Sequence, residues 1–96
     1  MLNQQQCAVV KTTAKVRALF HVLGGADTNF LPRILGPLAK QGHVPERLHA
    51  STEDGGSIMT IDLRMARATQ ATAKRIENAL RIIVGVHQVI ETYERG

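Results

Sequence analysis

The sequence predicts an α+β fold of the ferredoxin-like type, with the order βαββαβ, four antiparallel strands and two helices on one face of the sheet. Three observations support this prediction. Apolar residues alternate in steps of two over four segments and recur at helical spacing over two others. The dipeptide Asp54-Gly55 separates the second and third alternating segments, where it predicts a hairpin. Each helical segment lies between two strand segments, as two right-handed β-α-β crossovers require.

The first strand segment, KVRALFHVLG at residues 15–24, is largely apolar on both of its alternating sides, which is typical of a central strand. The first helix is predicted at residues 30–41, with Thr28 or Asn29 as its N-cap and Gly42 just past its end. Gly36-Pro37 lies inside this helix. Proline removes a helical hydrogen bond and costs roughly 3 kcal/mol if unrelieved, so we expect a bend or a break at Gly36.

The second strand segment, HVPERLHAST at residues 43–52, contains Pro45, and a proline is tolerated mainly in an edge strand. The third, at residues 57–66, places four apolar side chains on one face: Met59, Ile61, Leu63 and Met65. A second helix is predicted at residues 69–83 with Thr69 as N-cap, and a fourth strand at residues 86–93 whose pattern does not indicate the buried face. The expected spatial order is fourth, first, third, second.

Composition indicates one folded domain. The chain has 96 residues, of which 44% are hydrophobic, and a formal net charge of +4. We expect residues 1–14 to form a partly disordered or extended N-terminal extension and residues 15–96 to form the domain. A signal peptide and a membrane span are not recognised, so a cytoplasmic protein without membrane attachment is expected. The single cysteine, Cys7, excludes an intrachain disulfide.

Several functions known for this fold class lack their residues here. The loop after the first strand, GGADTN, has no Cys-x-x-Cys pair for a metallochaperone and no arginine for an acylphosphatase-like phosphate cradle. Phe20 is the only candidate for an aromatic RNA-binding platform. The four histidines show no metal-ligand spacing, and no nucleophile stands at a sharp strand-to-helix turn. We therefore expect no metal, no cofactor and no catalytic residue.

The loop from Gly24 to Asn29 remains as a candidate site. Its two glycines allow close backbone approach, and its last residues precede helix N–H groups that attract a carboxylate. These residues alone are also consistent with a simple helix cap, so residue patterns leave the two interpretations open.

The chain resembles an ACT domain over residues 16–93, and it is most similar to the ACT domain of the short regulatory (small) subunit of acetolactate synthase. One matching stretch follows the pattern Leu-x-Arg-φ-φ-Gly…Gly…Glu-x-Leu, where φ is apolar, through Leu31, Arg33, Ile34, Gly36, Gly42, Glu46 and Leu48. A second is LRIIVGVHQV at residues 80–89. The resemblance implies a non-catalytic protein that binds a catalytic large subunit in branched-chain amino acid biosynthesis.

The resemblance also implies a homodimer that pairs through the second strand and binds an amino acid between one chain's first loop and the other chain's second strand. The implied ligand-binding residues are Gly24, Gly25, Ala26, Asp27, Thr28, Asn29, Phe30, His43 and Val44. The implied dimer edge contains Pro45, Arg47, His49 and Ser51. Ala26, Thr28-Asn29 and Val44 depart from the pattern of valine-responsive subunits, so we expect weak or no binding of valine.

Two alternatives remain. The protein could be a free-standing amino-acid-binding ACT regulator of another enzyme. It could also be a basic nucleic-acid-binding domain, although a solvated helix surface is the simpler interpretation of its basic residues. The candidate phosphate-facing residues are Arg64, Arg67, Lys74, Arg75 and Arg81.

Overall fold

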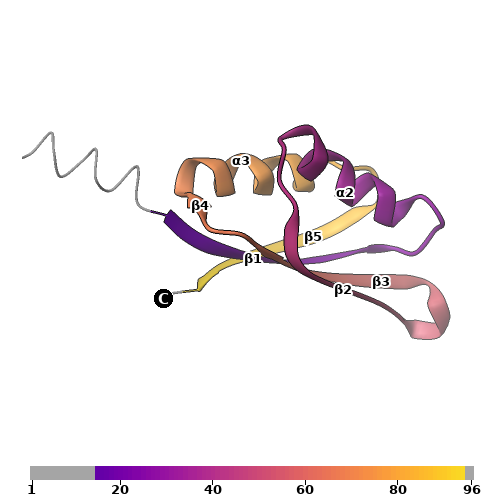
Figure 1. The fold of residues 1–96 in the computed structure, drawn as a ribbon. Coiled ribbons are helices and arrows are strands. Elements are labelled where there is room, and N and C mark those ends of the chain that lie inside the picture. Colours follow the sequence, from indigo (N-terminus) through magenta and orange to yellow (C-terminus); the bar gives the residue numbers. More distant parts are fainter. Residues whose placement is uncertain (1–14, 95–96) are drawn as a thin grey trace, which may run out of the picture.

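The computed structural model describes residues 15–94, and the predicted N-terminal extension lies outside them. Within residues 15–94, two helices cover one face of an antiparallel sheet and leave the other face open (Figure 1). The strands are β1 (Lys15–Gly25), β2 (Pro45–Glu53), β3 (Ile58–Met65), β4 (Ala68–Thr69) and β5 (Val86–Glu94), and the helices are α2 (Phe30–Lys40) and α3 (Gln70–Arg81). Within this range, no helix is long and apolar enough to cross a bilayer.

The order of the long strands is β2-β3-β1-β5, which confirms the predicted topology. Strand β1 is central, and β2, with Pro45 at its start, is an edge strand. The short strand β4 was not predicted; it pairs Ala68 and Thr69 with the first two residues of β1. The hairpin between β2 and β3 forms where Asp54-Gly55 predicts it, because both residues adopt positive φ.

The core lies between the helices and one face of the sheet. Ala18, Phe20 and Val22 of β1 point into it and are at most 2% exposed, whereas Leu19 and His21 lie on the open face and are half-buried. The same alternation settles β5, where Val89 is buried and Ile90 is on the open face. Other members of the core are Phe30, Ile34, Leu38, Ile61, Leu63, Met65, Ala73, Ile76 and Leu80.

Helix α2 runs without interruption through Gly36-Pro37, so the predicted break is wrong. Ile34 and Leu38, on either side of the pair, are both buried in the one core, and this packing holds the helix together across the missing hydrogen bond. As predicted, Gly42 lies just past the end of the helix, and its φ is 75°. The N–H of His43 donates to the carbonyl of Leu38 at 2.8 Å, the long bond of a Schellman cap.

Helix α3 begins with the predicted cap. The Thr69 hydroxyl accepts a hydrogen bond from the N–H of Thr72 at 3.2 Å. Its buried face consists of Ala73, Ile76, Leu80 and one acidic residue, Glu77.

Candidate functional site

Backbone hydrogen bonds attach the loop between β1 and α2 to two other segments of the chain. The N–H of Gly25 donates to the Gly85 carbonyl at 3.1 Å, and the N–H of Ala26 donates to the Ser57 carbonyl at 3.0 Å. These bonds join the loop to the start of β5 and to the hairpin end of the sheet. These bonds therefore hold the loop in a defined position relative to the sheet.

The glycines of the loop differ. A Cβ on Gly24 would lie 2.3 Å from the ring of Phe30 and 2.5 Å from the Gly85 carbonyl oxygen, whereas a Cβ on Gly25 would meet nothing within 4 Å. Phe30 is itself fully buried. The close approach at Gly24 is therefore made by the protein's own core, and the backbone of Gly25 is the part of the pair that is open to a ligand.

The polar residues of the loop also differ in what they contact. A carboxylate oxygen of Asp27 accepts a hydrogen bond from the Asn29 N–H at 2.7 Å, and its other oxygen lies 3.4 Å from Nη1 of Arg33. Asn29 is the N-cap of α2, but its side chain forms no capping hydrogen bond. Asp27 rather than Asn29 thus orders the helix start, which leaves the side-chain amide of Asn29 for other interactions.

His43 and Val44, the other predicted ligand-binding residues, follow the C-terminal end of α2 and lie at the opposite end of the sheet from the loop. Pro45 pairs with Met65 at the last residue of β3, whereas Gly25 pairs with Ile58 at its first. One chain therefore does not bring the two predicted halves of the ligand site together.

The predicted dimer-edge residues lie on β2, as expected, but they do not all lie on one face of it. Pro45 is on the helix side, opposite Met65. Arg47, His49 and Ser51 are on the open face, where the Ser51 and Thr60 hydroxyls are hydrogen-bonded at 2.9 Å.

A hollow of about 500 Å³ occupies this open face. The residues that line it come from all four long strands. Its lining is Leu19, Phe20, His21, Arg47, His49, Asp62, Leu63, Arg64, Ile90, Thr92 and Glu94. Two predicted dimer-edge residues, Arg47 and His49, are therefore also part of a concave surface that the sequence does not reveal.

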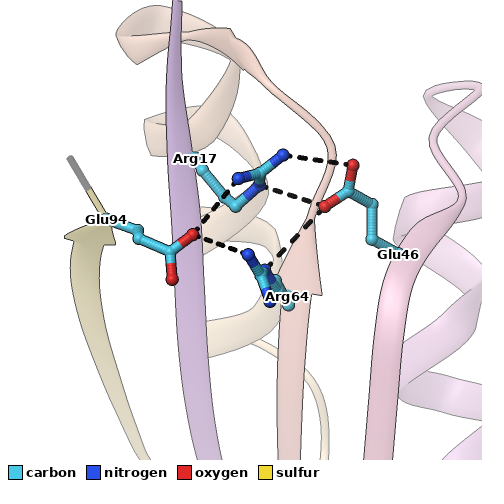
Figure 2. Close-up of polar contacts among 4 residues, drawn as sticks. All are labelled: Arg17, Glu46, Arg64 and Glu94. Atoms are coloured by element: carbon cyan, nitrogen blue, oxygen red, sulfur yellow. Dashed lines mark hydrogen bonds and ion pairs between the residues drawn. The ribbon is translucent and has the colours of Figure 1, made fainter. Parts of the chain in front are cut away.

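One end of the hollow carries a ring of four alternating charges, shown in Figure 2. The Glu94 carboxylate lies 3.2 Å from Nη1 of Arg17 and 2.8 Å from Nη2 of Arg64. Oε1 of Glu46 lies 3.0 Å from Nε of Arg17 and 3.9 Å from Nε of Arg64. Hydrogen bonding to Glu94 raises the pKa of Arg17 above its ordinary value, so Arg17 stays charged.

Glu46 joins this ring because β2 contains a bulge. The register passes from Pro45 opposite Met65 directly to Arg47 opposite Arg64, so Glu46 is an extra residue. Simple alternation places Glu46 on the same side as Leu48, and that expectation is wrong. The bulge turns its carboxylate toward the two arginines.

Two further groups of polar side chains contact one another. The His21–Asp62 pair was not predicted, whereas helical spacing predicts the Glu77–Arg81 pair but places it on the outside of the helix, and Glu77 is in fact buried. On the open face, Nδ1 of His21 lies 2.6 Å from Oδ1 of Asp62, its cross-strand neighbour. On the helix side, hydrogen bonds from Lys74 and Arg81 lower the pKa of the buried Glu77 to about 2. Burial raises the pKa of Glu91, and the carboxylate of Glu77 beside it adds to that shift. His21 contacts Asp62 because the strand register places them opposite each other. Glu77 contacts Lys74 and Arg81 because they lie three and four residues away on the same helix.

Comparison with known proteins places the chain in a family. The family profile described as an ACT-like domain matches residues 11–94. No curated protein sequence matches. Among solved structures, the ACT domain from the GTP pyrophosphokinase of Chlorobium tepidum is similar, with a TM-score of 0.69 and 18% identity, over 82% of this chain and 100% of that one.

A second similar structure is an uncharacterized protein from Thermotoga maritima, with a TM-score of 0.71 and 12% identity, over 85% of this chain and 100% of that one. At these identities the structures show a shared fold. The family profile spans nearly the whole domain, and the chain therefore belongs to the ACT-like domain family.

Proposed function

We propose that this protein is a non-catalytic regulatory subunit that forms a homodimer, senses an amino acid and tunes the catalytic large subunit of acetolactate synthase. Membership of the ACT-like family supports the regulatory part of this proposal, since ACT domains are typically regulatory. The sequence resemblance at Leu31–Leu48 and at residues 80–89 favours the acetolactate synthase partner over other enzymes.

The observation that supports the dimer is the position of β2. It is an edge strand, and its outer backbone groups have no neighbouring strand within the described sheet. Val44 and Leu48 beside this edge are 80% and 36% exposed, so a partner that covered them would remove apolar surface from water. A second copy that adds its own β2 would continue the sheet and cover them.

Antiparallel pairing of two β2 strands would also assemble the predicted ligand site. The start of β2 and the loop at Gly25–Asn29 lie at opposite ends of one sheet. An antiparallel neighbour reverses that direction, so its His43 and Val44 would come to the loop end of the first chain. The open backbone at Gly25 and the free Asn29 side chain would then face them.

The ligand and the oligomer can be tested on the purified protein. Light scattering after size exclusion is expected to give the mass of a dimer, and a thermal-shift panel of the twenty amino acids identifies the effector. We expect little or no shift with valine. Asn29→Trp should abolish any shift that does occur, whereas Asn78→Trp, at an exposed asparagine on α3, should leave it unchanged. An undiminished shift in Asn29→Trp would place the ligand elsewhere.

The partner requires a separate experiment. Tagged protein should retain the purified thiamine-diphosphate-dependent large subunit of acetolactate synthase from the same organism and raise its rate. If it neither binds that subunit nor changes its rate, the acetolactate synthase assignment is wrong. A free-standing ACT regulator of another enzyme would then be the remaining interpretation, and it is equally compatible with the family.

The nucleic-acid alternative has less support. Arg64 lies in the ring on the open face, whereas Lys74 and Arg81 are paired with Glu77 on α3, on the other side of the sheet. The basic residues proposed for it therefore do not form one surface.

A further inference from the structure

We propose that the hollow on the open face of the sheet is a second binding site, for a small carboxylate with an aliphatic body. This site is separate from the loop and is present within one chain. It does not rest on the proposed regulatory partner or on the dimer.

The strand register builds the hollow from two rows of side chains. One row runs from Arg47 across Arg64 and Leu19 to Thr92, and the next from His49 across Asp62 and His21 to Ile90. Strand β2 thus supplies a basic wall, and the two strands at the other side supply aliphatic side chains. A volume of about 500 Å³ lies within the range of roughly 300–1,000 Å³ typical of small-molecule pockets.

The charges that line the hollow are compensated except on β2. Arg64 and Glu94 belong to the ring of four charges, and Asp62 is bonded to His21. Arg47 forms no ion pair with any residue in the range 15–94 and stands directly opposite Arg64, another cation. Among the described residues the guanidinium of Arg47 therefore lacks a counter-charge, which a bound anion would supply.

A carboxylate is the anion that fits this wall. The guanidinium of Arg47 can bind one through two parallel hydrogen bonds, and His49 on the same face of β2 offers a further ring nitrogen. A dianion such as phosphate would place a second charge near Asp62 and Glu94, which also line the hollow.

The far side of the hollow favours an apolar body on the ligand. Leu19 lies on β1, between Arg64 of β3 and Thr92 of β5. Ile90 on β5 is 44% exposed although its side chain is large and aliphatic. Covering these side chains would contribute roughly 25 cal/mol for each Å² removed from water. Charge at one end and apolar contact at the other would thus orient the ligand across the sheet.

Titration of the full chain with isocaproate, followed by amide NMR, tests the site. We expect shifts at Leu19, Arg47 and Ile90 and none at Gly25–Asn29. Acetate lacks the aliphatic body and isocaproamide lacks the charge, so both should bind at least about tenfold more weakly. L-leucine and α-ketoisocaproate share the same skeleton, and their relative affinities distinguish an amino acid from a 2-oxo acid as the natural source.

Two arginine variants complete the test. Arg47→Gln should weaken isocaproate binding by about tenfold or more, whereas Arg75→Gln, at an exposed arginine on α3, should have no effect. Both residues are exposed, so both variants should fold. Equal binding of isocaproamide, unchanged binding by Arg47→Gln, or shifts confined to the Gly25–Asn29 loop would each overturn the proposal. The last outcome would instead support the loop site.

Discussion

At the scale of single residues, two neighbouring glycines show that the role of a glycine depends on which atoms surround it in the fold. The sequence assigns Gly24 and Gly25 the same role of close backbone approach. In the structure only Gly24 is closely approached, by the buried ring of Phe30 and by the Gly85 carbonyl. A pattern in the sequence cannot distinguish the two, because the atoms that meet Gly24 come from α2 and from the segment before β5.

Gly24→Ala is expected to destabilise the fold by about 1–3 kcal/mol, because its Cβ would lie 2.3 Å from a Phe30 ring carbon in a packed core. A Cβ on Gly25 would meet nothing within 4 Å, so Gly25→Ala should change the free energy of unfolding by less than about 0.5 kcal/mol. Chemical denaturation of both variants measures the difference. Equal losses in the two would mean that backbone freedom, and not contact with Phe30, is what matters there.

The side chains of Glu77 on α3 and Glu91 on β5 are both buried, but replacing each residue by glutamine is expected to change stability in opposite directions. The pKa of Glu77 is lowered to about 2, so its charge stabilises the fold above pH 4.5 and that contribution is lost as the pH falls toward 2. The pKa of Glu91 is raised, so its charge costs stability above its folded-state pKa and costs nothing below 4.5.

Glu77→Gln should therefore lower the free energy of unfolding at pH 7, by about 1–2 kcal/mol once the solvent screening of its half-exposed partners is allowed for. Glu91→Gln should raise it by roughly 1 kcal/mol, and the gain should vanish below pH 4.5. Thermal melts between pH 3 and pH 7 measure both, with the exposed Glu53→Gln as control. A loss in Glu91→Gln at pH 7 would mean that the Lys74 contact at 3.6 Å outweighs burial.

At the scale of elements, helix α2 shows that tertiary packing can keep a helix continuous through an internal proline. Local preference alone predicts a bend or a break at Gly36-Pro37, and the helix does not break because its buried face is anchored on both sides. The C-terminal cap of α2 and the N-cap of α3 were predictable, since Gly42 and Thr69 act through bonds within a few residues. The bulge at Glu46 was not, because a bulge is a property of two paired strands.

Gly36→Ala is expected to change the free energy of unfolding by less than about 0.5 kcal/mol, because the helix preference of alanine is offset by the clash between a Cβ on the residue before Pro37 and the proline ring. Gly42→Ala should destabilise it by about 1 kcal/mol or more, because that residue has a φ of 75°. The two glycines bracket the end of one helix, so denaturation midpoints compare them directly. Stabilisation by Gly42→Ala would contradict the observed cap.

At the scale of the whole molecule, the fold was predictable and the open face was not. The two β-α-β crossovers, the first strand that is apolar on both sides, and Pro45 at an edge were enough to order the strands. The concave face depends on which side chains meet across four strands, and Arg47 and Ile90 are 43 positions apart in the sequence. The loop site adds a further step, since its predicted halves can meet only between two copies, and sequence resemblance alone suggests that pairing.

The ring of four charges has a consequence for how the sheet assembles. Its arginines are on the inner strands β1 and β3, and its glutamates are on the outer strands β2 and β5 (Figure 2). A sheet with only the inner strands paired would hold two cations together with no anion between them. Each outer strand that joins brings one carboxylate to both cations, so the ring favours completion of the sheet at each of its two edges.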